Sequence, residues 1–248
     1  MLEDYIFGIR PVLESLESGK KPEKVLIQKG LQGDNFQRLF SLIRKMNLPF
    51  QHVPVQRLNR ITRRNHQGVI AYFPAIEYHS LEDLLPGIFE GGNVPLLVIL
   101  DGITDVRNLG AVARSAECAG AHALVLPEKG SATVTADAIK ASAGALSRIP
   151  VCKESSLLQS IAFLKECGIM ILALDDKGQK SLYDQNLTNP LAVIMGSEDK
   201  GVSAAARKLS DHTTAIPMKG KIASLNVSVA AGIVLFEALR QRSKQGLT

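Results

Sequence analysis

The 248-residue sequence contains few cysteines, and their arrangement matches no common cysteine-based structure. Cys118, Cys152 and Cys167 are odd in number, and none has a second cysteine at CxxC spacing. Neither a disulfide framework nor a zinc site is therefore predicted. The five histidines also fail to cluster at ligand spacing, so we expect no metal site. Scattered thiols fit a reducing compartment best, and we expect the protein to be cytoplasmic.

Long apolar runs are also missing. No run reaches the roughly 18 residues that a membrane span requires. The first residues, MLEDYIFGIRPVLESL, lack the basic-then-apolar order of a signal peptide. We therefore expect a protein that stays in the compartment where it is made. Hydrophobic residues make up 46% of the chain and charged residues 21%, which argues against a disordered or collagen-like chain.

Three common catalytic motifs are absent as well. Neither GxGxxG nor GxxxxGK[ST] occurs at a strand-to-helix turn, which disfavours a conventional NAD enzyme and a P-loop NTPase. No GxSxG elbow is present, which argues against the common hydrolases. The function therefore has to come from another kind of site.

Positive charge is concentrated in the first third of the chain. Residues 1–74 contain 12 Lys and Arg against 6 Asp and Glu, whereas the remainder contains 17 against 18. The whole net charge of +5 therefore comes from the first third. Such asymmetry suits a module that contacts the phosphates of a polyanion, and a solvated basic surface would give the same count.

The hydrophobic pattern divides the chain into two domains. In residues 1–74, helical patterns (FGIRPVLESLESG, NFQRLFSLIRKMN) alternate with strand patterns (KVLIQ, PFQHVPV, GVIAYF), which predicts a small α/β domain. Prolines and glycines then accumulate, and we interpret residues 75–93 as a linker with one short helix. In residues 94–248 the strand candidates are nearly continuous apolar runs: PLLVIL, HALVLP, GIMILAL, PLAVIMG and TTAIPM. Such strands are buried on both faces, so this part is predicted to be a doubly wound α/β domain with a parallel sheet.

Polar residues follow three of these predicted strands. They are Asn108 and Arg114 after the first strand, Glu198 after the fourth, and Ser224 and Asn226 after the fifth. Gly196, at the end of the fourth strand, would let the backbone approach a ligand closely. The polar residues have plainer explanations: the serine or the second asparagine as a helix N-cap, the glutamate as a carboxylate at a helix start, the arginine as a surface ion-pair partner. Because ligands bind beyond the carboxyl ends of parallel strands, the three exits together nevertheless indicate one site.

Three blocks of sequence carry these residues: DGITDVRNLGAVARSAECAGAHALVLP, VIMGSEDKGVS and IPMKGKIASLNVSVAAGIVLFEALRQR. In order and spacing they resemble the three motifs of SpoU-type RNA ribose 2′-O-methyltransferases, which belong to the knotted SPOUT superfamily. The resemblance covers residues 96–242. The first segment, with FGIRPVLESL and HQGVIA, resembles the L30e-like RNA-binding domain of the ribosomal-RNA branch. The likeness is strongest to the RlmB-like enzymes, which modify a guanosine of large-subunit ribosomal RNA.

The resemblance implies the fold and the assembly. Residues 94–248 would form a knotted parallel-sheet methyltransferase domain, with a trefoil knot at its carboxyl end, and residues 1–74 a small L30e-like RNA-binding domain. A homodimer is also implied, with the site completed across the interface. An apolar stripe on the last predicted helix is compatible with a dimer, or packs only within its own domain. It comprises Val227, Ala230, Ala231, Val234, Leu235 and Ala238.

The resemblance further implies S-adenosylmethionine as the methyl donor and no metal. The donor pocket would be formed largely by backbone near Leu174, Gly196, Ile216, Met218 and Leu225. Apolar side chains would then surround the adenine, and main-chain groups would contact its edge. For Ile216 and Leu225, core packing is the plainer explanation.

Five polar residues match motif positions around the acceptor ribose and the methionine end of the donor: Asn108, Arg114, Glu198, Ser224 and Asn226. The family assigns Arg114 the role of general base, but a guanidinium is almost never neutral in a protein. We favour a clamp in which Arg114 holds a neighbouring phosphate and stabilises the developing alkoxide. The proton acceptor stays open.

The cations Arg57, Arg60, Arg63 and Arg64 are predicted to contact RNA phosphates, with a solvated face as the alternative. Ribosomal RNA is the favoured substrate, because the simplest transfer-RNA enzymes of this family lack a basic domain such as residues 1–74. A transfer-RNA ribose methyltransferase is the first alternative. A non-catalytic RNA-binding ribosome-assembly factor is the second, and the presence of Arg114 and Asn226 argues against it.

Overall fold

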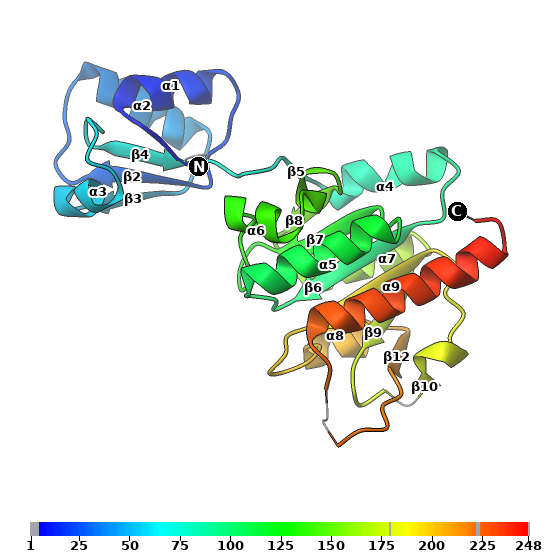
Figure 1. The fold of residues 1–248 in the computed structure, drawn as a ribbon. Coiled ribbons are helices and arrows are strands. Elements are labelled where there is room, and N and C mark those ends of the chain that lie inside the picture. The colour runs from blue at the N-terminus through cyan, green and yellow to red at the C-terminus, as the bar shows by residue number, and fades with distance from the viewer. Residues whose placement is uncertain (1–4, 179, 222–223, 248) are drawn as a thin grey trace. The chain divides into compact units, whose positions relative to one another are not determined.

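The structure is a computed structural model and describes residues 5–178, 180–221 and 224–247. The chain forms two compact units, residues 1–75 and residues 76–248 (Figure 1). None of the described helices combines the length and apolar character needed to cross a lipid bilayer.

The first unit contains a four-stranded sheet in the order β1-β4-β2-β3. Its strands are β1 (Tyr5–Phe7), β2 (Lys24–Gln28), β3 (Phe50–Val53) and β4 (Val69–Tyr72). Strand β4 is antiparallel to both β1 and β2, and β3 pairs in parallel with β2. Strand β3 therefore lies at one edge of this sheet.

Three helices cover the sheet of the first unit: α1 (Ile9–Glu17), α2 (Asp34–Lys45) and α3 (Val55–Ile61). Apolar residues three and four apart give α2 one buried face, which includes Leu39 and Ile43. That face and α1 pack on the side of the sheet that carries Val25 and Ile27. Helix α3 covers the other side, where Leu58 contacts the apolar residues of β2 and β4 (Figure 1).

The second unit contains an eight-stranded sheet in the order β10-β12-β9-β11-β6-β7-β8-β5, and every described pairing in it is parallel. The strands are β5 (Tyr78–His79), β6 (Leu96–Asp101), β7 (Ala123–Pro127), β8 (Val151–Glu154), β9 (Met170–Leu174), β10 (Lys180–Ser181), β11 (Leu191–Gly196) and β12 (His212–Ala215). The five apolar runs correspond to β6, β7, β9, β11 and β12. The predicted parallel sheet is therefore confirmed.

Helices cover both faces of this sheet. They are α4 (Leu81–Glu90), α5 (Val106–Cys118), α6 (Ala136–Ala141), α7 (Leu157–Glu166), α8 (Ala204–Leu209) and α9 (Val227–Lys244), with short 3-10 helices at Ala145–Ser147 and Leu182–Asp184. Helices α5, α6 and α9 pack on the face that carries Val98 and Leu100. Helices α4, α7 and α8 pack on the face that carries Leu97 and Ile99. Alternate residues of one strand thus point into two cores, which is why β6 shows no polar alternation.

The segment interpreted as a linker, residues 75–93, contains strand β5 and helix α4, which belong to the second unit. Helix α4 continues through Pro86 because Leu81, Leu85 and Ile88 on one side of it are buried against the sheet. Burial of those side chains outweighs the helix-breaking tendency that proline and glycine suggested in the sequence.

Helix α9 packs within its own unit. The stripe that includes Val227, Val234 and Leu235 is buried against α5 and the sheet, so these residues need no second chain to cover them. Near the end of α9 the buried Arg242 guanidinium donates to four backbone carbonyls, those of Val94, Pro95, Leu187 and Asn189. This anchor ties α9 to the segments that precede β6 and β11, the two central strands.

Candidate active site

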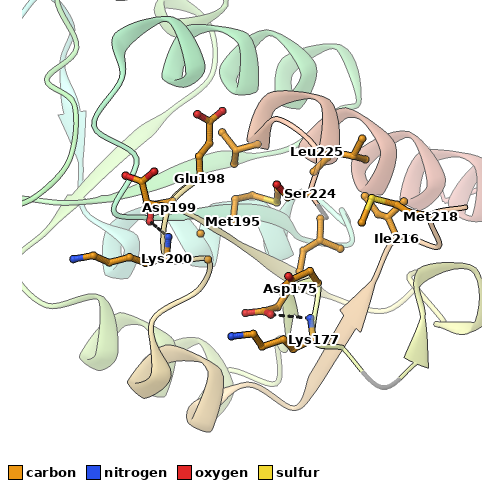
Figure 2. A pocket seen from close by; sticks show the side chains of 17 residues that line it. Asp175, Lys177, Met195, Glu198, Asp199, Lys200, Ile216, Met218, Ser224 and Leu225 are labelled. Atoms are coloured by element: carbon orange, nitrogen blue, oxygen red, sulfur yellow. Dashed lines mark hydrogen bonds between the residues drawn. The ribbon is translucent and has the colours of Figure 1, made fainter. Parts of the chain in front are cut away.

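The ends of three neighbouring strands, β9, β11 and β12, and the segments that follow them enclose a cavity of about 260 Å³ (Figure 2). Strands β12, β9, β11 and β6 are adjacent in the sheet and run in the same direction, so the segments that follow them meet at one edge. The cavity is lined by the ends of β9 and β11, by the loop after β11, and by the segment between β12 and α9. The predicted exits that carry Gly196 and Ser224 therefore meet at one cavity, whereas no described residue of the loop after β6 or of α5 lines it, and Asn108 is connected to it through Glu198.

All five predicted donor-pocket residues line this cavity: Leu174, Gly196, Ile216, Met218 and Leu225. Met218 is 41% exposed and Leu225 39%, which is unusual for large apolar side chains beside a concave surface. A flat apolar ligand face would cover them. The cavity also carries more acidic than basic side chains, since Asp175, Asp176, Glu198 and Asp199 line it with Lys177 and Lys200. An apolar wall with a negative balance fits a donor that joins a purine to a sulfonium cation.

Three predicted polar residues are hydrogen-bonded to one another beside the cavity. Asn108 Nδ2 donates to Glu198 Oε1 at 3.2 Å, and Asn226 Nδ2 donates to Asn108 Oδ1 at 3.1 Å. Asn226 Nδ2 also donates to Glu198 Oε1, so one carboxylate oxygen accepts from both amides. The cluster joins α5, the loop after β11 and the start of α9, elements far apart in the sequence.

Two helix N-caps hold this cluster in place. Asp105 caps α5 by accepting from the N–H groups of Arg107 and Asn108. Asn226 caps α9 through Oδ1, which accepts from the N–H of Ser228 at 2.9 Å. The asparagine is thus an N-cap and a member of the cluster at once, because its oxygen serves the helix while its amide nitrogen faces Glu198. Asn226 can therefore be both a helix N-cap and a site residue, the two roles considered for it in the sequence.

Gly196 allows the loop after β11 to pack directly against the end of that strand. A Cβ atom at this position would lie 2.0 Å from the backbone carbon of Gly201, because the loop after β11 folds back to form a bridge between Ser197 and Gly201. The sequence analysis assigned this glycine to close contact with a ligand. The structure gives an additional reason for glycine, since the return of the loop forms part of the cavity wall.

Asp175 is a further residue of the cavity that the sequence analysis did not identify. Its side chain is only 3% exposed and accepts from the backbone N–H of Lys177 at 3.0 Å (Figure 2). It also forms a 3.0 Å ion pair with Arg207 of α8. These contacts connect the segment after β9 with the helix after β11. The only available signal was its place directly after a buried strand, beside Leu174.

Arg114 and Ser224 lie outside the hydrogen-bonded cluster. Ser224 lines the cavity (Figure 2). Arg114 is exposed on α5, and the described residues offer it no hydrogen-bond or ion-pair partner. The Arg114 guanidinium is therefore available to contact a ligand or a second chain.

The large pKa shifts of the second unit arise away from the cavity. Burial raises the pKa of the Cys152 thiol to about 12 and lowers the pKa of the Arg242 guanidinium to about 10. Hydrogen bonding from Arg240 lowers the pKa of the Glu237 carboxyl to about 2, and these two residues form an ion pair on α9. All three shifts follow from packing around the sheet and α9.

The four predicted RNA-contacting arginines are exposed on the first unit. Arg57 and Arg60 lie on α3, and Arg63 and Arg64 follow it. The buried His66 holds the next turn, because its Nε2 contacts Asn59 Oδ1 at 2.8 Å and its Nδ1 accepts from the N–H of Gly68. Within the described part of the chain, no group of three or more histidine, cysteine or acidic residues is arranged to hold a metal.

Comparison with known families agrees with both the cavity and the division into two units. Residues 95–236 match the SpoU rRNA Methylase family, and residues 5–79 match the domain described as RNA 2′-O ribose methyltransferase substrate binding. The chain belongs to the SpoU rRNA methylase family. The resemblance noted in the sequence is thereby confirmed.

Individual relatives in the SpoU family extend along most of the chain. The 23S rRNA (guanosine-2′-O-)-methyltransferase RlmB of Photobacterium profundum is 37% identical over 244 residues, which cover 98% of this chain and 99% of the relative. The SpoU methyltransferase AviRb of Streptomyces viridochromogenes, solved with AdoMet, is 25% identical with a TM-score of 0.62 and covers 97% of this chain and 90% of its own. The TrmH/SpoU tRNA modifying enzyme of A. aeolicus is 28% identical with a TM-score of 0.57 and covers 67% of this chain and 86% of its own.

Membership of the SpoU family defines the reaction class. The chain is an RNA 2′-O-methyltransferase, and S-adenosylmethionine is its methyl donor. The cavity described above, with its apolar wall and its negative balance, suits that donor.

Proposed function

We propose that this SpoU-family enzyme methylates the ribose 2′-oxygen of a guanosine in large-subunit ribosomal RNA. The observation that carries the catalytic part is the cluster of Asn108, Glu198 and Asn226 at the cavity. The ribosomal substrate is supported by the relative named RlmB, which aligns along nearly the whole of both chains.

The donor supplies a methyl group bonded to a positively charged sulfur. Leu174, Ile216, Met218 and Leu225 would cover the adenine, and the loop that Gly196 allows to fold back would form the wall beside it. The acidic residues of the cavity stabilise positive charge in it. These residues thus bind and orient the donor.

The acceptor ribose is held, in this proposal, by the amide and carboxylate cluster. Methyl transfer forms a bond from the ribose 2′-oxygen to the methyl carbon, breaks the carbon–sulfur bond, and releases the proton of the 2′-hydroxyl. Glu198 Oε1 is occupied by two amides, whereas Oε2 has no partner among the described residues. Oε2 can therefore accept from the 2′-hydroxyl and fix the direction of its attack. Ser224, on the cavity wall, would orient the ribose or the donor carboxylate.

Arg114 is proposed to bind a neighbouring RNA phosphate and stabilise the developing alkoxide. A guanidinium is a strong donor and a very poor base, so electrostatic clamping is the easier role for it. The proton would leave to phosphate or water. The exposed position of Arg114 on α5 is compatible with a contact made by incoming RNA.

A homodimer is part of the proposal. Helix α9 exposes two large apolar side chains to solvent, Val229 at 51% and Phe236 at 49%, and the partly buried Ile233 lies between them in sequence. Helices α5 and α9 pack side by side (Figure 1). Pairing through α9 would bring Arg114 near a second copy, which supports a site completed by both chains.

The remaining parts of the proposal concern organisation. Residues 1–74 would act as an L30e-like RNA-binding domain, with Arg57, Arg60, Arg63 and Arg64 on the phosphates, and residues 94–248 as the methyltransferase domain. A carboxy-terminal trefoil knot is expected from family membership. A cytoplasmic location follows from the proposed substrate.

The alternative substrate is transfer RNA. The tRNA modifying enzyme of A. aeolicus aligns with only 67% of this chain, whereas the rRNA methyltransferase RlmB aligns with 98%. The additional cationic unit therefore favours ribosomal RNA. A non-catalytic assembly factor is a second alternative that the same experiment tests.

The test is transfer of tritium from labelled S-adenosylmethionine to protein-free large-subunit RNA, transfer RNA and a large-subunit assembly intermediate in parallel. Label in large-subunit RNA, mapped to one guanosine ribose, is expected. Label in transfer RNA alone would support the first alternative, and RNA binding without label in any substrate would support the assembly factor. The variant Glu198→Ala should bind RNA normally and transfer no label above background.

A further inference from the structure

An exposed aromatic patch lies at the β3 edge of the first unit, on the face of the sheet that α2 covers, whereas α3 with its arginines covers the opposite face. It consists of Phe40 on α2 and of Phe50 and His52 on β3, with Arg44 beside them. Phe50 is 36% exposed and His52 is exposed, although both side chains come from a strand. Single exposed apolar residues are common, but apolar side chains that are exposed next to one another mark interaction sites on soluble domains.

The rings of the patch are held by regular secondary structure. Phe50 and His52 are two residues apart on β3, so both point to the face of the sheet that α2 covers. Ring centroids lie 5.2 Å apart for Phe40 and Phe50, and 5.7 Å apart for Phe50 and His52. Behind them the buried Phe36 stacks on Phe40 at 5.6 Å, one helical turn away. The patch is therefore formed before any ligand arrives.

The charge around the patch has one sign. Arg44 Cζ lies 5.4 Å from the centre of the Phe40 ring. Residues 35–76, which include most of α2 and all of β3, α3 and β4, contain seven Lys and Arg and no Asp or Glu. A polyanion is therefore attracted to this part of the unit, whereas an acidic peptide would not use the ring faces.

The patch and the phosphate-contacting arginines lie on consecutive elements. Strand β3 ends at Val53, and α3, which carries Arg57 and Arg60, begins at Val55. Arg44 lies at the rings themselves, and the arginines of α3 follow on the next element. Aromatic faces and cations on one small domain are a combination that binds unpaired nucleotides, because bases stack on the rings while the cations contact the backbone. A perfect duplex cannot use the rings, since its bases are already stacked.

We propose that Phe50 and His52, supported by Phe40, form a stacking surface for unpaired bases of the substrate RNA. The inference rests on the proposed function for its ligand and adds the class of RNA structure that the first unit recognises: a single-stranded loop, bulge or junction. Specificity of this kind selects the fold of the RNA near the target ribose, which phosphate contacts alone do not distinguish.

The test uses the absence of tryptophan from the chain. In full-length Phe50→Trp the single indole reports on the patch, and Phe89→Trp, at a 41% exposed position of α4, is the matched control. The probes are a ten-nucleotide oligoadenylate and an RNA duplex with the same number of phosphates. Quenching of the Phe50→Trp variant by the oligoadenylate, with little quenching by the duplex and none of the Phe89→Trp control, is expected.

The affinity of Phe50 variants for the oligoadenylate separates a stacking role of this ring from a purely structural one. Phe50→Leu keeps an apolar side chain and should weaken oligoadenylate binding about tenfold, as Phe50→Ala does, while Phe50→Tyr should bind as the parent chain. Parent-like binding by Phe50→Leu would overturn the proposal, as would equal quenching by single strand and duplex. An emission change of Phe50→Trp with protein concentration alone would assign the patch to a second copy of the chain and also overturn it.

Tritium transfer by the same variant separates this proposal from the function it rests on. Label in ribosomal RNA without tryptophan quenching by any RNA would refute the stacking surface and leave the enzyme assignment intact. Quenching by the oligoadenylate without label in any RNA would refute the proposed function and leave the stacking surface intact.

Discussion

In the second unit three of the five candidate catalytic residues are hydrogen-bonded to one another, whereas in the first unit the residues assigned to RNA are exposed. Asn108, Glu198 and Asn226 are hydrogen-bonded to one another before a substrate is present. Arg57 and Arg63 stand exposed on or beside a short helix. The difference suggests that the two units have separate roles: the second fixes the geometry of the reacting groups, and the first supplies affinity for RNA. Substitutions in the second should change the rate of transfer, and substitutions in the first should change RNA binding.

The largest effect is expected at Arg114. Arg114→Ala should lower the rate of methyl transfer by at least roughly three orders of magnitude, because it removes the charge proposed to stabilise the developing alkoxide. Calorimetry should find donor affinity within a few-fold of the parent, since Arg114 is not among the residues that line the cavity. Arg114→Lys should recover little activity, because a point charge does not replace a bidentate clamp. Near-normal transfer by Arg114→Ala would remove Arg114 from the site.

Substitutions of Asn226 can separate its role as the N-cap of α9 from its role in the hydrogen-bonded cluster. Asn226→Ser keeps an N-cap oxygen for α9 but loses the amide that donates to Glu198 and Asn108. The rate of transfer should fall about 100-fold while the melting temperature stays close to the parent value. Asn226→Ala should lower the rate equally and also destabilise the fold by about 1 kcal/mol, because the cap is lost. Equal rates for Asn226→Ser and the parent would show that the asparagine serves only as a cap.

The sheet and the edge that carries the site could be predicted because their signals are local in sequence, whereas the donor-pocket residues and the role of Arg114 came from the resemblance to the SpoU family. Continuous apolar runs such as those of β6 and β11 can be buried only in the middle of a parallel sheet, and their order along the chain places the exits at one edge. Strand β8, with the sequence VCKE, is half polar, and β5 and β10 are two residues each. These three strands form because they pair with neighbouring strands, and no local sequence pattern predicts that pairing.

Tertiary contact also explains what the sequence analysis did not anticipate at the site. The close approach of Gly196 to Gly201 and the ion pair of Asp175 with Arg207 depend on how the loop after β11 returns to the sheet. The stripe on α9 is another example, because its apolar period is the same whether the partner is α5 or a second chain. Periodicity identifies the buried face of a helix and not the surface that covers it.

Substitution of Asp175 tests whether buried contacts in the second unit also position the methyl donor. Asp175→Asn should weaken donor binding about tenfold, because the loop that carries Lys177 loses a charged partner, and leave transfer at saturating donor within a few-fold. Because Arg207 is one-third exposed, we expect a stability loss of only about 1–2 kcal/mol. Asp211→Asn is the control, since Asp211 also accepts from a backbone N–H and pairs with a lysine, and it does not line the donor cavity. A similar loss of donor affinity in both variants would mean that destabilisation alone is responsible.

The smallest effect is expected in the first unit, where affinity is spread over several cations. The double variant Arg63→Gln, Arg64→Gln should raise KM for RNA several-fold at constant kcat. It should also reduce the slope of log Kd against log salt by about 1 to 2, as expected for two lost phosphate contacts. Lys20→Gln, Lys21→Gln removes the same charge from another exposed segment of the unit and should change the slope much less. If both pairs changed the slope equally, general attraction by net charge would replace a defined phosphate-binding surface. If the arginine pair lowered kcat instead of affinity, the first unit would take part in geometry and the proposed separation of roles would fail.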